Sequence, residues 1–383
     1  MNNKTLGLFF SYGVGVETWE KQGYLNRELK YYTKLSQQLG KVSFFTYDSK
    51  QKFQKTSFED GKFGEILIFS KESNLPNFLY SFLMVFLYGK MIKQCDILKT
   101  NQMSAVVPAI IAKVIYKKKL VVRCGYEWLY SLIKAKKPFW KKVVVYCLEW
   151  VAYKMADIII FTSKADKAFA QKIFKIKESK IAIVPNYIDT DLFKPLPSVK
   201  KEPNSVCYVG RLSKEKNVNL LIGAISELPE TKLYIAGEGP LKQELQQQAI
   251  GLGLKERVVF LGKVPNEQLP QLLNKCVIFS LPSSYEGNPK ALLEARGCGT
   301  TLTIGSDIEG NRDIINHNKD GYLHQPTALE IKKMIKNCLK EAVRSQSEYQ
   351  SKVKKAREDT ILKSGLESVL QKELDMLSDI YYT

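Results

Sequence analysis

The sequence predicts an α/β protein made of two doubly wound domains that face a cleft between them. Strand-like runs alternate with helical runs along the chain, which is typical of parallel sheets with crossover helices. The length of 383 residues exceeds the roughly 250–300 residues at which a single core stops growing. A proline-rich segment, residues 194–203, separates two such series and is expected to be an extended linker. We therefore expect a first domain over residues 1–195, a second over 204–360 and a helical tail over 361–383.

The predicted strands alternate with helices in both halves of the chain. In the first half they are residues 6–12, 42–46, 97–100, 120–123, 158–162 and 181–185, with helices such as 24–39 and 106–116 between them. In the second half they are residues 205–209, 232–236, 258–261, 277–281 and 301–303. Residues 341–382 are predicted to be helical, because apolar residues near their end recur every three or four positions.

The composition is that of a globular protein, with 45% hydrophobic and 25% charged residues, which excludes the disordered and collagen-like classes. No apolar run reaches the ~18–20 residues of a transmembrane helix, and the nearest, residues 77–88, is too short. The first residues show no signal-peptide pattern. The seven cysteines contain no C-x-x-C pair, so neither a zinc site nor a disulfide framework is expected. These features favour a cytoplasmic protein with reduced thiols.

Most of the net charge of +19 lies in the first 200 residues, which predicts an anionic partner for the first domain. Phe139 and Trp140 lie within a cluster of five lysines: Lys134, Lys136, Lys137, Lys141 and Lys142. A basic segment with interfacial aromatic residues is typical of proteins that lie on an anionic membrane surface. The alternative is a solvated lysine-rich loop that steers an anionic acceptor.

A first candidate site lies in residues 281–295, where a predicted strand is followed by a glycine-containing loop and a helix. Pro289 is expected at the first position of the helix, which proline favours, and Gly287 permits close approach of a ligand to the backbone. The N–H groups of such a helix start attract a phosphate or a sugar hydroxyl. Glu286 and Glu294 would suit a ligand with hydroxyls at both ends, such as a nucleotide sugar. Solvated helix glutamates are the alternative.

A second candidate site lies in residues 209–217, just past the first strand of the second domain. In open α/β sheets, ligands bind beyond the carboxyl ends of the strands. Arg211 and Lys216 could hold a diphosphate there and neutralise the charge it gains when it leaves. A solvated basic loop is the alternative.

Together the two stretches resemble the large retaining glycosyltransferases of family 4 (glycosyl transferases group 1), which have the GT-B fold of two Rossmann-like domains. The resemblance covers most of the chain. It includes, in order, residues 185–193, 235–241, 260–262, the Glu-x7-Glu spacing of the first site, 310–315 and 320–323. It implies that the C-terminal helix packs back on the N-terminal domain.

The resemblance also implies a role for each donor-side residue. Arg211 and Lys216 would grip the donor diphosphate, Glu286 would contact hydroxyls of the transferred sugar, and Glu294 would bind the ribose. The other donor-binding positions are Gly210, Lys263, Val264, Gly287, Asn288, Pro289 and Lys290, with Lys263 and Val264 near the base. Neither a cofactor nor a metal ion is expected. Asp189-Thr190-Asp191 looks like a D-x-D metal signature, but it falls in the family's linker-proximal loop.

The acceptor side is expected on the first domain, at Gly13, Gly15, Gly23, Asn101 and Glu127. Gly13 and Gly15 also form a Gly-x-Gly, which lacks the third glycine of a dinucleotide fingerprint. Family members often carry a histidine directly before a glycine at the place that reads Cys124-Gly125 here. A same-face retaining reaction can transfer the acceptor proton to the leaving phosphate, so it does not need a histidine base. The missing histidine therefore affects the prediction of the acceptor more than that of the reaction class.

The sequence thus indicates a metal-independent retaining glycosyltransferase of the hexosyl or N-acetylhexosaminyl type, peripheral on the inner face of the cell membrane. It would move a sugar from a nucleoside diphosphate sugar, with UDP favoured, to a glycan or lipid-linked acceptor of cell-envelope polysaccharide biosynthesis. Two alternatives keep the fold: a catalytically silent sugar-nucleotide-binding subunit, and a nucleotide-sugar epimerase or hydrolase. A nucleic-acid-binding protein would explain the charge but not the two sites, and no nucleic acid is expected as a partner.

Overall fold

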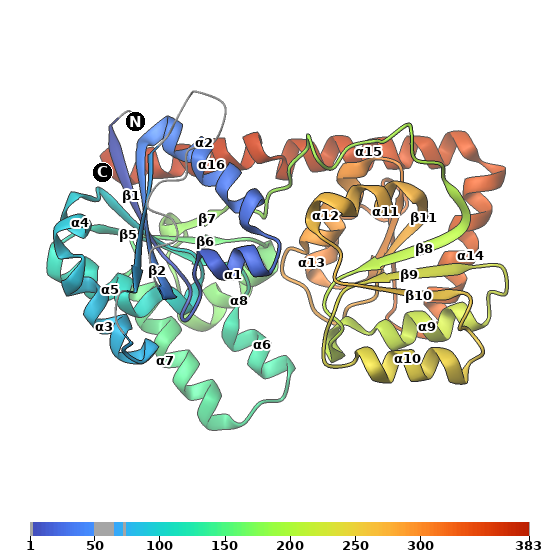
Figure 1. The fold of residues 1–383 in the computed structure, drawn as a ribbon, viewed down its shortest axis with the longest axis horizontal. Coiled ribbons are helices and arrows are strands. Elements are labelled where there is room, and N and C mark those ends of the chain that lie inside the picture. The colour runs from blue at the N-terminus through green and yellow to red at the C-terminus, as the bar shows by residue number, and fades with distance from the viewer. Residues whose placement is uncertain (1–2, 50–64, 72–73, 383) are drawn as a thin grey trace. The chain divides into compact units, whose positions relative to one another are not determined.

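The computed structural model describes residues 3–49, 65–71 and 74–382. The chain divides into two compact units, residues 1–184 with 369–383, and residues 185–368 (Figure 1). Residues 185–195, expected in the first domain, therefore belong to the second unit. The physical reason is that Ile188 and Phe193 are buried in the core of that unit, and the backbone N–H of Ile188 donates to Ser364 O at 2.8 Å.

The first unit is built on a sheet of seven parallel strands in the order β3-β2-β1-β4-β5-β6-β7. These strands are β1 (Lys4–Phe9), β2 (Gly40–Ser49), β3 (Glu65–Lys71), β4 (Ile97–Thr100), β5 (Lys119–Cys124), β6 (Ile158–Phe161) and β7 (Ile181–Ile183). The order runs outward in both directions from β1 and β4. This is the doubly wound arrangement, with its switch point between those two strands.

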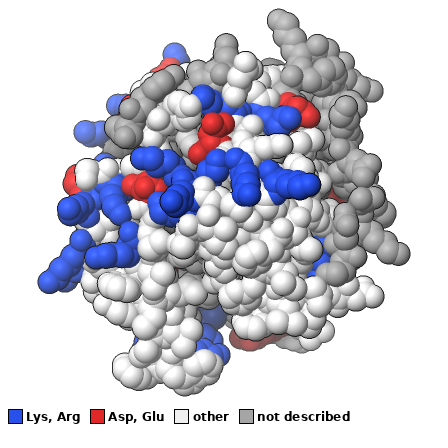
Figure 2. Space-filling model, turned by 90° about the vertical axis from the view of Figure 1, so that its left-hand side faces the viewer, with Lys and Arg blue, Asp and Glu red and all other residues white. Residues whose placement is uncertain are grey.

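Helices cover both faces of this sheet, because successive side chains of a strand point to opposite faces. On one face, Phe9 and Phe45 lie in a core with α3 (Asn77–Leu87), α4 (Gly89–Gln94), α5 (Val106–Tyr116) and α7 (Phe139–Met155). On the other face, Phe10 and Phe44 contact Trp19 of α1 (Val16–Lys21), and Phe44 also contacts Tyr32 of α2 (Leu25–Leu39). The remaining helices are α6 (Trp128–Lys134) and α8 (Lys164–Phe174). Lys and Arg side chains gather in a band across the end of this unit (Figure 2).

The last helix, α16 (Leu366–Tyr382), returns to the first unit, as the GT-B resemblance implied. Glu373 on α16 is fully buried, pairs with Lys99 of β4 and accepts a 2.7 Å hydrogen bond from Tyr31 of α2. Burial raises the pKa of Glu373, but the charge and hydrogen bond of Lys99 outweigh it, so the pKa lies below its ordinary value. The ion pair thus fixes α16 against the sheet.

The second unit holds six parallel strands in the order β10-β9-β8-β11-β12-β13. They are β8 (Glu202–Val209), β9 (Lys232–Ala236), β10 (Val258–Gly262), β11 (Cys276–Leu281), β12 (Leu302–Ser306) and β13 (Tyr322–His324). The helices are α9 (Val218–Ser226), α10 (Lys242–Gly251), α11 (Leu269–Lys275), α12 (Lys290–Cys298), α13 (Glu309–Arg312), α14 (Ala328–Arg344) and α15 (Gln346–Ser364). The switch point of this sheet lies between β8 and β11.

The α/β class with two parallel sheets is confirmed, and most elements lie where the sequence predicts them. Strands 97–100 and 232–236 and helix 106–116 match to the residue. Strands β3 and β13 were not predicted, and β8 begins at Glu202, inside the proline-rich segment. Across the part of the chain that the structure describes, no helix is both long and apolar enough to span a lipid bilayer.

Candidate functional site

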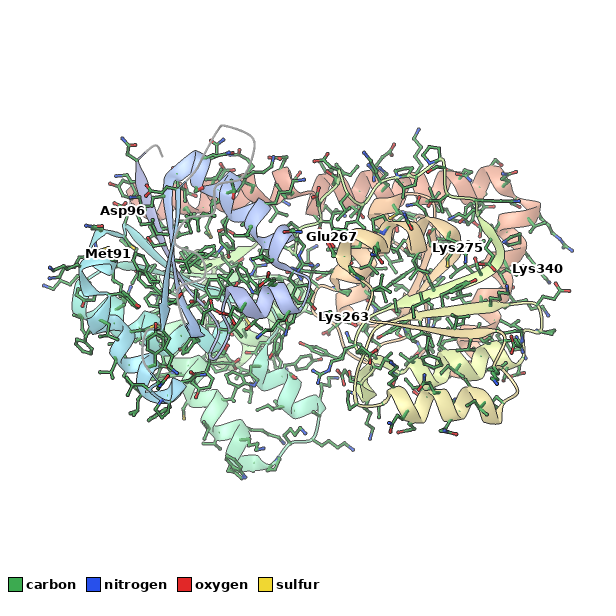
Figure 3. The ribbon with its side chains drawn as sticks, viewed as in Figure 1. Met91, Asp96, Lys263, Glu267, Lys275 and Lys340 are labelled. Atoms are coloured by element: carbon green, nitrogen blue, oxygen red, sulfur yellow. The ribbon has the colours of Figure 1, made fainter. Side chains whose placement is uncertain are left out.

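The two candidate motifs of the second unit lie at the switch point of its sheet. Residues 210–217 follow β8 and residues 282–289 follow β11, and these two strands are neighbours. Because the carboxyl ends of parallel strands share one edge, the two loops meet there. Figure 3 shows Lys263 and Glu267, which follow β10, at this same edge, whereas Lys340 of α14 lies at the opposite one. Such an edge is where open α/β sheets bind ligands.

Glycines hold the first loop close to its neighbours. Gly237, which follows β9, has φ +149°, and a Cβ there would lie 1.8 Å from Gly210 O. The backbone N–H of Gly210 donates to Ala236 O at 3.0 Å, and that of Leu212 donates to Glu238 O at 2.9 Å. No larger residue fits at Gly237 without moving the Gly210 carbonyl. The backbone of the Arg211 loop is therefore fixed, although the Arg211 side chain itself is exposed.

The structure brings Lys216 and Glu286 together, seventy residues apart in the sequence. Lys216 Nζ donates to Glu286 Oε1 at 2.5 Å, and Ser283 Oγ donates to the same oxygen at 2.6 Å. The side chains of Lys216 and Glu286 are only 21% and 9% exposed. The predicted cation and the predicted carboxylate thus form one half-buried ion pair that joins the two loops.

Further contacts between the loops keep this pair in place. The Ser284 N–H donates to Glu215 O at 2.8 Å, and Asn217 Nδ2 donates to Pro282 O at 3.1 Å. Asn217 follows a short helical turn, Lys214–Lys216, and adopts φ 51°, a left-handed conformation that asparagine tolerates. The site is therefore preorganised, because both loops are held by main-chain contacts as well as by the ion pair.

The turn before α12 is packed against α13. A Cβ at Gly310 of α13 would lie 2.2 Å from Glu286 O and 2.5 Å from Gly287 O, so only glycine fits there. Asn288 is nearly buried, and its side-chain oxygen accepts a 2.8 Å hydrogen bond from the Asn186 N–H. Pro289 is not the first helical residue that the sequence predicted: its backbone is extended, it is the N-cap residue, and α12 begins at Lys290. The Lys290 ammonium lies 5.3 Å from the centre of the Tyr187 ring.

Glu294 lies in the second turn of α12 and is only 5% exposed. Its Oε1 accepts a 3.2 Å hydrogen bond from Asn266 Nδ2, which comes from the loop after β10. That loop also carries Lys263, which is exposed, and Val264, which is half-buried. The structure therefore brings Glu294 next to the loop that was expected to lie near the base of the donor.

A buried ion pair anchors α12 itself. Arg296 is fully buried, and its guanidinium donates to Asp320 Oδ1 at 2.9 Å and to Thr360 Oγ1 of α15 at 3.1 Å. Burial raises the pKa of Asp320, but the Arg296 hydrogen bond and charge outweigh it and hold the pKa below its ordinary value. The helix that carries Glu294 is thereby fixed to the last long helix of its unit.

The expected acceptor-side glycines follow β1 of the first unit. Gly15 precedes α1, and a Cβ there would lie 1.9 Å from Asp48 Oδ1. Asp48 accepts hydrogen bonds from the Val16 N–H at 2.8 Å and the Glu17 N–H at 3.2 Å, so its carboxylate occupies the start of α1. Gly13 and Gly23 both have positive φ, and a Cβ at Gly23 would meet nothing within 4 Å. Asn101 follows β4, and its N–H donates to Phe9 O at 2.8 Å. Gly13, Gly15 and Asn101 thus follow the two strands that flank the switch point of their sheet.

Glu127 requires a correction, because its carboxylate is fully buried and cannot face an acceptor. Its Oε2 accepts a 2.8 Å hydrogen bond from the Tyr130 N–H, which makes it the N-cap of α6. Glu149 of α7 accepts hydrogen bonds from the Trp128 and Leu129 N–H groups and also bonds to Glu127. Burial, followed by the Glu127 charge, raises the pKa of Glu149 to about 9, so Glu149 is protonated at neutral pH. The two glutamates cap α6 and do not form an acceptor site.

The neighbouring Cys124 is equally inaccessible. It is fully buried, and burial raises the pKa of its thiol well above the ordinary value.

Asp189 Oδ1 accepts a 3.1 Å hydrogen bond from the Asp191 N–H, which closes a local turn. Among the described residues, no group of three or more histidine, cysteine, aspartate or glutamate side chains is placed to hold a metal ion.

Three residues that contact the predicted site were not singled out from the sequence. Ser283 bonds to Glu286, Asn266 bonds to Glu294 and Asn186 bonds to Asn288. Ser283 could have been found, because it stands three residues before Glu286 in the same loop. Asn266 and Asn186 are distant in sequence from their partners, and only the fold brings them together.

Comparison with known proteins gives two family models that match consecutive parts of the chain. The model of glycosyl transferases group 1 matches residues 189–359, and that of glycosyltransferase family 4 matches residues 33–192. Their boundary falls close to the division between the two units of the structure.

Curated relatives include two enzymes whose names specify undecaprenol-linked substrates. The N-acetylgalactosamine-N,N'-diacetylbacillosaminyl-diphospho-undecaprenol 4-alpha-N-acetylgalactosaminyltransferase of Campylobacter jejuni is 33% identical over 174 residues, which are 45% of this chain and 47% of that protein. The UDP-Gal:alpha-D-GlcNAc-diphosphoundecaprenol alpha-1,3-galactosyltransferase of Escherichia coli is 27% identical over 245 residues, which are 60% of this chain and 62% of that protein. The chain thus spans about half to three fifths of the length of these relatives.

Among solved structures, Anabaena HepE in complex with UDP shares the fold over almost the whole chain. The TM-score is 0.74 at 20% identity, covering 98% of this chain and 100% of that one.

Proposed function

The chain belongs to the glycosyltransferases of group 1, which have the GT-B fold, and from this premise we propose that it is a metal-independent, retaining sugar transferase. Its donor would be a nucleoside diphosphate sugar, with UDP as the carrier, and its acceptor a glycan or a lipid-linked sugar. The observation that carries the proposal is the Lys216–Glu286 pair at the switch point of the second sheet. In this pair, a cation that would bind the diphosphate lies beside a carboxylate that would bind sugar hydroxyls.

Each donor-side residue has a role that its position supports. Lys216 and the exposed Arg211 bind the diphosphate. Gly210 and the turn before α12 lie at the same edge of the sheet, where the N–H groups of Gly287, Asn288 and Lys290 are the donors and Pro289 has none. Glu286 accepts hydrogen bonds from the sugar. Glu294 binds the ribose, and Lys263 and Val264 flank the base.

The reaction follows from these positions. The bond between the anomeric carbon and the leaving diphosphate oxygen breaks, and the acceptor hydroxyl attacks from the same face of the sugar. The acceptor proton passes to the leaving diphosphate, so no protein base is needed. Lys216 and Arg211 stabilise the negative charge that develops on that diphosphate, and the rate comes mainly from this stabilisation and from positioning. A metal ion has no required role, because the two cations meet the charge.

The relatives support the choice of donor and acceptor. The Escherichia coli relative is named for a UDP-sugar donor and a diphosphoundecaprenol-linked acceptor, and the Campylobacter jejuni relative for a diphospho-undecaprenol-linked acceptor. HepE was solved with UDP. We infer a related acceptor here, which would bind to the first unit near Gly13, Gly23 and Asn101. The site of action is then the inner face of the cell membrane, with the lysine cluster at 134–142 binding anionic headgroups.

A thermal-shift panel of nucleotides tests the donor directly. A ligand of the native state adds about 2.7 kcal/mol of stability at one hundred times its Kd. UDP and UDP-sugars should raise the Tm more than GDP, ADP or their sugars, and Glu294→Gln should reduce the shift with UDP. Equal shifts with all nucleoside diphosphates would contradict the UDP assignment. No shift with any of them would overturn the donor site. Product analysis with a lipid-linked acceptor then separates transfer from mere donor hydrolysis.

A further inference from the structure

Helix α3 is apolar on all sides, although only one of its faces packs into the first unit. Tyr80, Met84 and Val85 lie in the core. The opposite face exposes six apolar side chains: Phe78, Leu79, Phe82, Leu83, Phe86 and Leu87. Phe78 and Phe86 are 62% and 61% exposed. A helix that is hydrophobic all round is normally buried, so this exposed side is suited to an apolar environment outside the unit.

Helices α5 and α7, on the same side of the sheet as α3, also expose apolar side chains. Helix α5 packs against both α3 and α7, and all three helices bury their other faces in the same core on one side of the sheet. Their exposed faces therefore point away from the sheet on that side. The exposed apolar residues of α5 are Val114 and Ile115, and those of α7 are Phe139, Trp140, Val143, Val144, Tyr146, Trp150 and Val151. We call these residues and the six of α3 the outer apolar face. Soluble monomers rarely expose an apolar patch of more than a few hundred Å².

Lysines border this face at two places. Tyr116 OH donates to Val85 O at 3.0 Å and holds the ends of α5 and α3 together, and Lys118 Nζ donates to Lys93 O at 2.7 Å. The lysines at this end are Lys90, Lys93, Lys117, Lys118 and Lys119, and the second group is the lysine cluster at residues 134–142. Figure 2 shows a band of mostly basic side chains, with a few acidic ones among them, and a broad, largely uncharged surface beneath it.

Acidic side chains do not balance these lysines. Residues 77–148 contain only two acidic residues, Asp96 and Glu127. Glu127 is buried, and Asp96 is half-buried and accepts a 2.8 Å hydrogen bond from the Thr5 N–H. The border of the outer apolar face is therefore positive.

We propose that the outer apolar face inserts into the acyl-chain boundary of an anionic phospholipid bilayer while the lysines on its border bind the headgroups. An apolar surface with a basic border is complementary to such a bilayer, and Trp140, Tyr146 and Trp150 are residue types that favour the interface. A second copy of the chain is a poorer occupant, because a two-fold interface would bring the same positive border against itself. This proposal rests on the proposed function in one respect only: the bilayer is taken to be the surface on which sugar transfer would take place.

Insertion differs from a purely electrostatic contact in its response to salt. Headgroup contacts of lysines are screened as ionic strength rises, whereas burial of apolar surface is not weakened by salt. Binding should therefore require anionic lipid to begin but resist a high-salt wash afterwards.

Liposome flotation tests this with the full chain, without nucleotide or acceptor. The vesicles contain phosphatidylcholine with or without phosphatidylglycerol, and bound protein is washed with NaCl. The test variant changes Phe78, Phe82 and Phe86 to Ser. A matched control changes three exposed apolar residues of the second unit, Ile250, Val343 and Leu362, to Ser. Because all six positions are exposed, both variants should keep the wild-type Tm and the stabilisation by UDP.

We expect wild type and control to float with phosphatidylglycerol vesicles and to remain bound in high salt. The α3 variant should lose about a hundredfold or more in partitioning, because three phenylalanines no longer enter the bilayer. Brominated lipids should quench tryptophan fluorescence in the wild type and not in the α3 variant. Equal salt-resistant binding of both variants would overturn the proposal. So would a stable soluble dimer that the α3 substitutions dissociate, which would assign the face to a second copy. Neither result affects the UDP shift, so failure here is distinguishable from failure of the sugar-transfer proposal.

Discussion

Replacement of Lys216 by alanine separates catalysis from folding at the donor site. Lys216 Nζ lies 2.5 Å from Glu286 Oε1, and the two side chains are 21% and 9% exposed. Such a pair lies between surface pairs, which contribute ~0–1 kcal/mol, and buried pairs, whose breakage costs ~3–5 kcal/mol. We expect Lys216→Ala to lose about 1–2 kcal/mol in the free energy of unfolding, or roughly 2–8 °C in Tm.

The loss in turnover should be much larger than the loss in stability. If Lys216 stabilises the departing diphosphate, its removal takes away a preorganised charge and lowers kcat ~10²–10³-fold, or ~2.7–4 kcal/mol in the barrier. The variant remains folded at 25 °C, so the two effects can be measured separately. The assay is the initial rate of sugar transfer at saturating donor, recorded beside a melting curve of the same sample.

Lys214 provides the matched control, because it belongs to the same short helical turn and is exposed. Lys214→Ala should leave kcat within about twofold of wild type and stability within about 0.5 kcal/mol. The reasoning is refuted if Lys216→Ala keeps the wild-type kcat, or if Lys214→Ala loses as much activity.

The remaining predictions concern the other carboxylates. Glu294→Gln should weaken UDP binding with little change in kcat, whereas Glu286→Gln should lower kcat more than it raises KM, because its partner is the reacting sugar; equal loss of UDP affinity in both, measured by titration calorimetry, would contradict this division. Transfer should survive excess EDTA, and Asp189→Asn should leave it intact; a strict requirement for Mn²⁺ would show that a metal takes part. The folded state keeps the proton of Glu149 up to a pKa of about 9, whereas the unfolded chain loses it near 4.5. The free energy of unfolding should therefore fall as pH rises between these values, and Glu149→Gln should remove part of this fall. Urea titrations at about pH 6 and pH 9 measure it, and an unchanged slope in the variant would argue against a protonated Glu149.

The alternation of strands and helices was readable from the sequence because buried parallel strands are continuous apolar runs. Strand 232–236 is of this kind, and helix 106–116 is also mostly apolar; both were placed to the residue. β13 has only three residues, too few for a pattern. β3 lies at the sheet edge but contains the apolar run Ile66-Leu67-Ile68-Phe69, so it could have been predicted from the sequence. The end of the first domain was predicted at residue 195 rather than 184, because no sequence signal shows that Ile188 and Phe193 belong to the core of the second unit.

The positions of the donor-side residues followed from the motifs, but their contacts did not. Sequence patterns put Lys216 and Glu286 after two strands, and only the strand order makes those strands neighbours. For Glu127 the position was predicted but the role was wrong. A carboxylate that follows a strand can either face a ligand or cap the next helix, and the burial of Glu127 shows that it is a cap. The sequence also showed that residues 77–88 are too short to span a membrane, but not that one side of α3 is exposed.

The central claim is tested most directly by one transfer reaction. The purified chain is incubated with UDP-sugars and GDP-sugars, excess EDTA and a diphosphate-linked polyprenyl saccharide, and the lipid product is analysed by mass spectrometry and by NMR of its anomeric proton. We expect a UDP-sugar to add one sugar with the anomeric configuration of the donor, and Lys216→Ala to abolish most of this product. An inverted linkage, a product formed only when metal replaces EDTA, or hydrolysed donor without any lipid product would contradict it.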